Sequence, residues 1–296
     1  MVQRFTLYKC TLAFYCGEKI MRKFILINLF FLFTILGCTS TSVKVATIRI
    51  KGSDTMLHLT DLLAQEYMEQ NPGISIYVDG GGTAAGVRSL IRGEVDICSA
   101  SRNLEPEEVK LLADIFGSIG ISYLIAKDGL CIYINENNPV KNFTQSQLKD
   151  LFTCKIINWK EIGGPDKPVS LIVRNPNSGT YLYFKEHILE GGDYCDNTLI
   201  GLTTENVIDI IKKNQYAIGY GGVAFKSEIE LAAIDNILPT EENIRNDKYP
   251  ITRYLHFYTR TQPTGAVKDF IDWVLSPKGQ SIIKKNGFVS LFEINY

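Results

Sequence analysis

The 296-residue sequence predicts an α/β protein of two lobes, on three observations. Short apolar strands alternate with amphipathic helices, which is the pattern of a sheet covered by helices. Hydroxyl- and glycine-rich turns follow several strands, at the sheet edge where α/β proteins bind ligands. Two extended segments, near residues 122–135 and 250–259, cross between the halves of the chain. We therefore expect a second lobe inserted into the first, with the two crossover strands as a hinge.

The first lobe is predicted from both ends of the chain, residues 46–128 and 252–296. Each lobe should be a mixed sheet flanked by helices. The turn Asn71-Pro72-Gly73 ends the first helix, and Pro277-Lys278-Gly279 begins the last turn of the chain. The expected strands are 47–51, 74–78 and 95–100, and the expected helices carry apolar stripes over 59–67, 87–91 and 267–275.

The second lobe is predicted from residues 129–251. Two apolar runs around Lys127-Asp128-Gly129 mark the crossover into it. A turn-rich loop follows at 158–165, because Asn158-Trp159 and Gly163-Gly164-Pro165 interrupt any regular pattern. The expected helices are 147–152 and 181–189, and the expected strands are 171–173 and 216–223.

The N-terminal segment predicts export. The basic Met21-Arg22-Lys23 precedes an apolar run, 24–36, that is short for a membrane span and typical of a signal peptide. Its ending, Leu36-Gly37-Cys38, resembles a bacterial lipobox, in which the cysteine is lipidated. We expect residues 1–37 to be an upstream extension and signal, 38–45 a linker, and Cys38 a lipid anchor to the outer (extracellular or periplasmic) face of the cell membrane. A plain signal peptide or an uncleaved anchor are the alternatives, and Met21 is a second candidate start.

Charge and composition exclude several classes of protein. Residues 1–37 hold five of the 31 basic residues and one of the 32 acidic ones, so 26 and 31 remain, a net charge of −5. Neither disorder nor a nucleic-acid-binding tail fits this composition. An anion-binding protein of negative net charge needs local, directed hydrogen bonds rather than an overall field. We expect a monomer without a nucleic-acid partner.

The seven cysteines form no CxxC pair and no cluster with metal-ligand spacing, so no metal or cofactor is expected. Cys98 and Cys131 lie in apolar runs and are predicted to be buried thiols. Cys154 and Cys195 could pair in an oxidising compartment, and the sequence leaves that question open.

The segment 174–180 is the strongest functional signal. Arg174 offers a permanently charged, planar fork of donors that suits phosphate or carboxylate. Ser178 and Thr180 carry hydroxyl donors, and Gly179 allows a close approach of the backbone. A helix start adds free N–H groups and a partial positive charge. The alternative is an N-capped helix beside a surface arginine.

Two earlier segments have the same character. Gly80–Gly86 contains Thr83, but it has neither the Walker A lysine nor the GxGxxG order of a dinucleotide site, and a flexible turn is the alternative. Gly52-Ser53-Asp54-Thr55 is a good helix cap, although the Asp54 carboxylate would repel a dianion. Asp54 therefore either accepts a proton carried by the ligand or pairs with a nearby arginine, of which Arg102 is the obvious one. Arg102 could also be a solvated surface cation.

Catalysis is not expected. His58, His187 and His256 are scattered, no GxSxG motif is present, and no pair of carboxylates stands out for acid–base work.

Together these segments resemble, in order, the phosphate-binding proteins of bacterial ABC importers. The resemblance rests on Gly52-Ser53-Asp54-Thr55-Met56, Gly80–Gly86, Val95-Asp96-Ile97 with Ala100-Ser101-Arg102, Arg174–Thr180, Asn158-Trp159 with Gly163-Gly164, Ile218-Gly219-Tyr220 and the run 275–280. It covers nearly all of the chain after the signal. It implies a periplasmic-binding-protein fold of the second type, phosphate capture without chemistry, and delivery to a membrane permease.

The resemblance also implies a set of ligand contacts. By position, these are Ser53, Asp54, Thr55, Thr83, Ala84, Ser101, Arg102, Arg174, Ser178, Gly179 and Thr180. Family members carry an aspartate where this chain has Arg102, and that aspartate accepts the proton of the ligand and so helps to reject sulfate. Our hypothesis is that Asp54 supplies the acid here instead. The alternatives are a binding protein for sulfate, molybdate or an organic phosphate, a surface phosphatase, and a lipoprotein used in adhesion or sensing.

Overall fold

The computed structural model describes residues 45–293. The predicted signal, nearly all of the linker and the anchor residue Cys38 lie outside the described residues. Within that range, no helix is both long enough and apolar enough to cross a bilayer.

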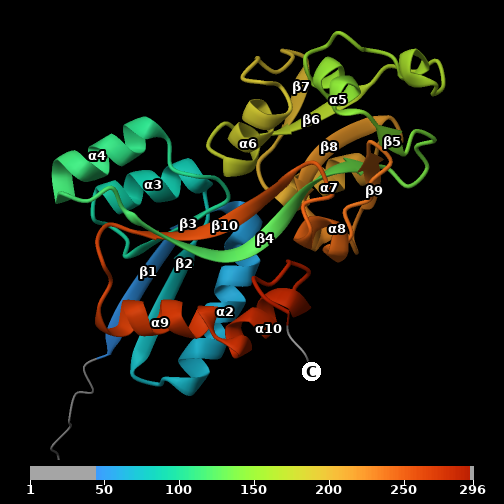
Figure 1. Cartoon of the computed structure of the whole chain (residues 1–296). Helices are drawn as coiled ribbons and strands as arrows, with labels where there is room; N and C mark the ends of the chain where they lie inside the picture. The colour runs from blue at the N-terminus through green and yellow to red at the C-terminus, as the bar shows by residue number, and fades with distance from the viewer. Residues whose placement is uncertain (1–44, 294–296) are drawn as a thin grey trace, which may run out of the picture. The chain divides into compact units, whose positions relative to one another are not determined.

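Two hydrophobic cores define two lobes (Figure 1). The core of lobe 1 is built from residues between Ile48 and Ala126 and between Leu255 and Phe288. The core of lobe 2 is built from residues between Leu130 and Ile251, with Val289 added from the C-terminal segment. Each fully buried Leu, Ile or Phe contributes about 1.5–3 kcal/mol by leaving water, so each core can stabilise its own lobe.

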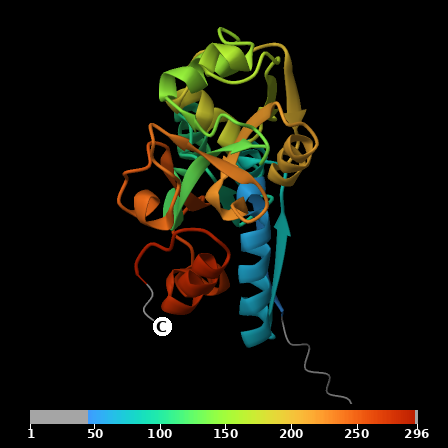
Figure 2. The ribbon, with the colours of Figure 1, turned by 90° about the vertical axis from the view of Figure 1, so that its right-hand side faces the viewer.

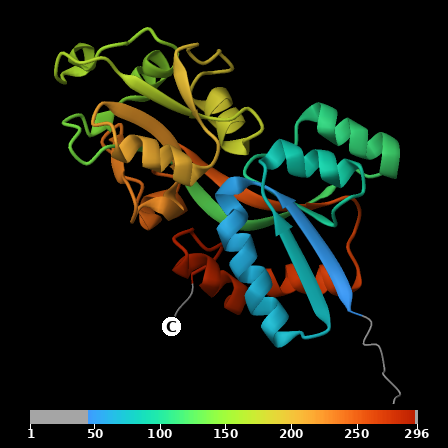
Figure 3. The same cartoon turned by 180° about the vertical axis from the view of Figure 1, so that it is seen from behind.

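The sheet of lobe 1 is mixed. Strand β1 pairs in parallel with both β2 and β3, and β3 pairs in antiparallel orientation with β10 (Thr252–Thr259). Helix α2 runs alongside β2, as Figure 2 and Figure 3 show from the side and from behind. The strands are β1 (Ala46–Gly52), β2 (Ile74–Asp79) and β3 (Ile97–Ala100), and the helices are α2 (Leu57–Gln70), α3 (Thr83–Ile91), α4 (Pro106–Phe116), α9 (Gly265–Leu275) and α10 (Pro277–Lys285). The strands and helices predicted here are confirmed. Helices α4 and α10 were not predicted, and α10 begins at Pro277, where a turn was expected.

The sheet of lobe 2 is also mixed. Strand β8 is antiparallel to the crossover strand that enters this lobe, whereas β6 is parallel to β8 and β7 is parallel to β6. Its strands are β5 (Asn142–Phe143), β6 (Ser170–Arg174), β7 (Thr198–Gly201), β8 (Ala217–Gly222) and β9 (Glu230–Ile234). Its helices are α5 (Gln145–Phe152), α6 (Gly179–His187), α7 (Thr204–Lys212) and α8 (Glu241–Arg245), with the 3-10 turns η2 (Trp159–Ile162) and η3 (Val223–Phe225). Strands β5, β7 and β9 and helices α7 and α8 were not predicted.

The crossover strands β4 (Ile121–Ile134) and β10 (Thr252–Thr259) lie side by side and connect the lobes (Figure 1). They are antiparallel, with Thr252 opposite Gly129 and Thr259 opposite Ile121. The two apolar runs predicted around Lys127-Asp128-Gly129 are one continuous strand. The strand continues through these polar residues because Asp128 forms an ion pair with Arg253 of β10.

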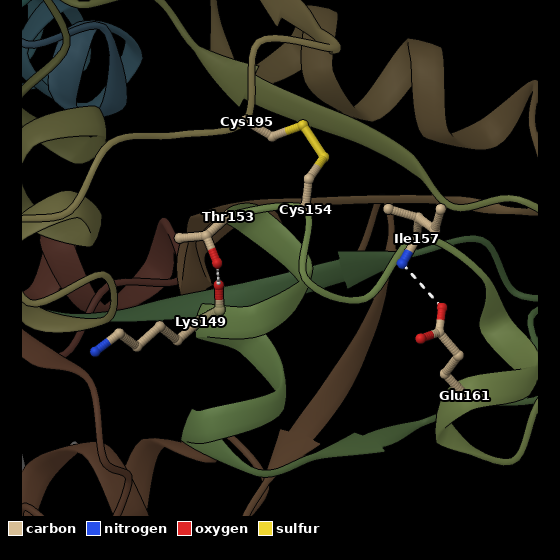
Figure 4. The surroundings of a disulfide bond; sticks show 6 residues. All are labelled: Lys149, Thr153, Cys154, Ile157, Glu161 and Cys195. Carbon is tan, nitrogen blue, oxygen red and sulfur yellow. Dashed lines mark hydrogen bonds between the residues drawn. A yellow bond between two sulfur atoms is a disulfide. The ribbon is translucent and has the colours of Figure 1, made fainter.

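Lobe 2 contains a disulfide between Cys154 and Cys195, with Cα atoms 5.4 Å apart (Figure 4). It ties the end of α5 to the segment that precedes β7. The backbone supports the same contact, because Cys195 N–H donates to the carbonyl of Phe152 over 2.8 Å. Cys98 and Cys131 are free and buried, as predicted, and burial raises the pKa of both thiols.

One histidine of β10 is buried beside the junction of the lobes. His256 Nδ1 lies 2.9 Å from Ser122 Oγ on β4. Burial, with a smaller contribution from the positive charge of Arg253, lowers the pKa of His256 to about 4. The imidazole is therefore neutral in the folded protein at neutral pH.

The stability of the folded protein should depend on whether the disulfide is oxidised. Closing a loop of 41 residues restricts the unfolded chain and should contribute about 4 kcal/mol. We expect the variant with both Cys154→Ser and Cys195→Ser to unfold at a lower temperature than the oxidised protein. Adding reductant should lower the melting temperature of the parent but not of the variant. Equal melting temperatures for the oxidised parent and the variant would contradict a stabilising role.

His256 predicts a loss of stability in mild acid. Its pKa is lower in the folded state than in the unfolded state, so between about pH 6.5 and 4 the unfolded chain binds more protons. Stability should therefore decrease as the pH decreases through this window, by at most about 3 kcal/mol from this group. Urea unfolding at pH 7 and pH 4.5 should show a smaller decrease for His256→Gln than for the parent. The exposed His58→Gln is the control, and equal decreases in all three proteins would reject the assignment.

Candidate anion site

Three turns from the two lobes converge at the predicted site. Thr55 lies in the 3-10 turn η1 (Asp54–Met56), directly after β1, and Thr83 begins α3 in the same lobe. Thr180 lies in the first turn of α6 in lobe 2. The hydroxyl oxygens of Thr55 and Thr180 are 3.0 Å apart, although the residues are 125 positions apart in the chain. The three turns predicted to share one ligand therefore do meet.

Two glycines allow this close approach of the lobes. A Cβ atom on Gly179 would lie 2.5 Å from Thr83 Oγ1 and 2.6 Å from Ser101 Oγ, which is too close for any side chain. Gly82 has a φ of +89° and faces the carbonyl oxygen of Asn177, 2.5 Å from the position of its missing Cβ. Beside it, Ala84 N–H donates to the same Asn177 carbonyl over 3.1 Å. The start of α3 thus contacts the turn before α6 directly.

Arg174 ends β6 and is buried at the junction, with 1% of its side chain exposed. Its Nη1 donates to Thr204 Oγ1 over 2.8 Å, and its Nη2 donates to Asp54 Oδ2 over 3.2 Å. Its Nε is buried and has no hydrogen-bond partner among the described residues. Burial lowers the pKa of Arg174 and the Asp54 carboxylate opposes this, but a guanidinium remains charged at any physiological pH.

Asp54 connects two of the predicted turns to Arg174. Its Oδ1 accepts the N–H of Gly81 over 2.8 Å, while Oδ2 accepts from Arg174 of the other lobe. The predicted pairing of Asp54 with Arg102 is wrong. Arg102 instead forms a bidentate ion pair with Glu108 of α4, with both distances 2.8 Å. The missed helix α4 explains the error, because it brings a closer carboxylate to Arg102.

The remaining hydroxyls are held by backbone N–H groups. Thr83 Oγ1 accepts the N–H of Ser101 over 3.2 Å, and Ser178 Oγ accepts the N–H of Thr180 over 3.2 Å as the cap of α6. A hydroxyl that accepts such a bond keeps its own proton for another acceptor. Ser53 and Ser101 are buried beside these groups. The site is therefore rich in groups that can donate to an oxyanion.

Sequence reasoning missed a second buried ion pair, between Asp128 of β4 and Arg253 of β10. Asp128 Oδ2 accepts from Nε and Nη2 of Arg253, over 3.0 and 2.8 Å. Arg253 Nη1 also donates to Thr180 Oγ1 and to the carbonyl of Ser101, each over 3.1 Å. Burial raises the pKa of Asp128, against the opposing effects of Arg253 and of the N–H groups of Val223 and Gly129. A signal was present in the sequence, because a charged residue within an apolar strand needs a buried partner.

The chemistry that this arrangement offers is anion binding. The two arginines are each paired with one aspartate, so the charges balance within the site. The Nε of Arg174 is a buried donor without a partner among the described residues, and charged or hydroxyl donors are the groups that bind an oxyanion. Among residues 45–293, no three histidine, cysteine or carboxylate side chains gather as a metal site would require.

The chain is similar in sequence to known phosphate-binding proteins. The profile of the PBP superfamily domain matches residues 39–278. The phosphate-binding protein PstS of Bacillus subtilis is 31% identical over 254 residues, which cover 84% of this chain and 82% of the relative. That of Pseudomonas aeruginosa is 28% identical and covers 81% of each chain.

Solved structures of phosphate-binding proteins have a similar fold. A chain from Clostridium perfringens, described as a phosphate ABC transporter substrate-binding protein with bound phosphate, superposes with a TM-score of 0.77 at 30% identity, over 83% of this chain and all of that one. An ABC-type phosphate transport receptor from Vibrio cholerae gives a TM-score of 0.69 at 26% identity, over 82% and 99% of the two chains. These likenesses confirm the predicted two-lobed fold of the second periplasmic-binding-protein type. The chain belongs to the PBP superfamily and, within it, to the PstS-like substrate-binding proteins.

Proposed function

We propose that this protein binds inorganic phosphate between its two lobes and delivers it to the permease of an ABC importer. The relatives named above support the ligand and the transport role. The observation that carries the proposal is the convergence of the turns at the junction of the lobes. Buried Arg174, with one N–H unpartnered, is paired with Asp54, and the hydroxyl of the adjacent Thr55 lies 3.0 Å from that of Thr180. A tetrahedral oxyanion needs donors on several sides, and the converging turns supply them from both lobes.

The proposed ligand contacts follow from these positions. Arg174 supplies a guanidinium donor, and Thr55, Thr83 and Thr180 supply hydroxyl donors, with Ser53, Ala84, Ser101, Ser178 and Gly179 beside them. Arg102 stays among the proposed contacts, because Glu108 accepts from both of its terminal nitrogens but its Nε, like that of Arg174, is buried without a hydrogen-bond partner among the described residues. Each hydrogen bond to a charged group contributes about 1.5–3 kcal/mol, so about six of them allow micromolar or tighter binding after desolvation.

Asp54 is the proposed acceptor for the proton of phosphate. It is the carboxylate of the site that contacts both Arg174 and the glycine turn. At neutral pH phosphate still carries at least one proton to donate, whereas sulfate carries none. A carboxylate facing the anion therefore favours phosphate and repels sulfate.

The lobes should close on the ligand, because one anion contacts turns from both. We infer that residues 46–128 with 252–296 and residues 129–251 are the two moving units, hinged at the crossover strands. The closed form is the one that a permease would recognise. Like other substrate-binding proteins, this chain is proposed to act outside the cytoplasm, as a monomer without enzymatic activity, attached to the membrane by a lipid at Cys38.

Removal of Arg174 should weaken phosphate binding strongly. Calorimetry on protein stripped of ligand should show at least a 100-fold weaker phosphate affinity for Arg174→Ala, because the anion loses a guanidinium donor and the Asp54 carboxylate beside it loses its cation. Arg174→Lys should recover part of this loss, since it restores charge without the planar fork. The exposed Arg92→Ala is the matched control and should bind like the parent. Normal phosphate affinity in Arg174→Ala would refute the proposed site.

Asp54 should determine selectivity more than affinity. The Asp54→Asn variant keeps the shape and the acceptor for Gly81 N–H but removes the negative charge. We expect sulfate to compete with phosphate much more effectively in this variant than in the parent, measured by equilibrium dialysis with labelled phosphate. Asp61→Asn, on the outer face of α2, is the control. Unchanged selectivity in Asp54→Asn would reject this role, and preference of the parent for sulfate or molybdate would change the proposed ligand.

A further inference from the structure

Arg253 contacts both lobes from the hinge strand β10. Its side chain is almost fully buried, and four of its five N–H groups are used. Two donate to Asp128, and the two on Nη1 donate to the Ser101 carbonyl of lobe 1 and to the Thr180 hydroxyl of lobe 2. Arg253 therefore differs from Arg174, whose Nε has no hydrogen-bond partner among the described residues.

The bond to Thr180 fixes the direction of a proton. A guanidinium has no acceptor, so in the contact between Arg253 and Thr180 the hydroxyl oxygen can only accept. The single proton of the Thr180 hydroxyl must then point elsewhere. Its neighbour on the other side is Thr55 Oγ1, 3.0 Å away across the junction of the lobes. The hydroxyl of Thr180 is thus held as a donor toward the side where the predicted turns meet.

Asp128 holds Arg253 in this orientation and balances its charge. Oδ2 of Asp128 accepts two N–H groups of the guanidinium, and Oδ1 accepts the N–H of Val223 at the start of η3. The paired guanidinium therefore contributes little net charge to an anion. Its effect on binding should come from the orientation of Thr180.

We propose that Arg253 is a positioning residue of the anion site, which makes the Thr180 hydroxyl an obligatory donor to the bound oxyanion without touching that anion itself. This inference rests on the proposed function, since it needs an anion between the lobes. It predicts that Arg253 contributes to phosphate affinity only while residue 180 carries a hydroxyl. A purely structural arginine would contribute equally with or without that hydroxyl.

A double-mutant cycle tests the proposal. Replacing Arg253 alone would leave the buried Asp128 carboxylate without a cation. Both members of the ion pair are therefore replaced together, by Asp128→Asn with Arg253→Met. Phosphate titration by calorimetry should show roughly 10-fold weaker binding in this variant, the value of one misdirected hydrogen bond to a charged group. Thr180→Val should also weaken binding. Adding the ion-pair replacement to Thr180→Val should change the affinity less than about threefold, because the two changes remove the same interaction.

Thr180→Ser is the conservative control, because it keeps the hydroxyl. In that background the ion-pair replacement should again cost about 10-fold in phosphate affinity. Thermal unfolding checks that each variant is folded at the titration temperature. Independent effects, in which the losses from the ion pair and from Thr180 multiply, would overturn the proposal, as would parental affinity after the ion-pair replacement. Failure of the proposed function is a different result, namely no phosphate binding by the unmodified protein.

Discussion

The structure depends on the burial of charge where two lobes meet. Arg174 and Asp54 come from different lobes and form one ion pair across the junction. Arg253 and Asp128 form another between the crossover strands. Burying a charge without a partner would cost several kcal/mol, so these pairs constrain how the lobes can come together. The hydroxyl groups and helix starts of the site are placed by that constraint.

The hinge and the site are parts of one network. Asp128 and Arg253 lie on the two strands that connect the lobes, and Arg253 reaches Thr180 at the start of α6. Asp54 of η1 accepts hydrogen bonds from Gly81 of the glycine turn in lobe 1 and from Arg174 of lobe 2. A ligand that bonds to these side chains therefore acts on groups that both lobes share. This is how a binding event can be coupled to lobe closure without any chemistry.

The sequence predicted best the part of the candidate site that is built from turns. The segments around Thr55, Thr83 and Thr180 could be predicted to meet, because turns at the carboxyl ends of strands gather at one sheet edge. The ion pair of Asp54 with Arg174 could not be predicted. Helix α4 and its Glu108 were not predicted, so Arg102 was available as the partner for Asp54. Arg253 and Asp128 were missed for another reason. They lie within strands, and only the register of β4 with β10 places them opposite each other. The disulfide was left open, because pairing depends on a distance that no local pattern determines.

The most direct test of the account is a high-resolution structure of the protein with phosphate bound. We predict one phosphate between the lobes, within hydrogen-bonding distance of Arg174, of a hydroxyl from Thr55 or Thr83, and of Thr180, with Arg253 still bonded to Asp128. A phosphate bound to one lobe only, or bound away from Arg174, would contradict the account.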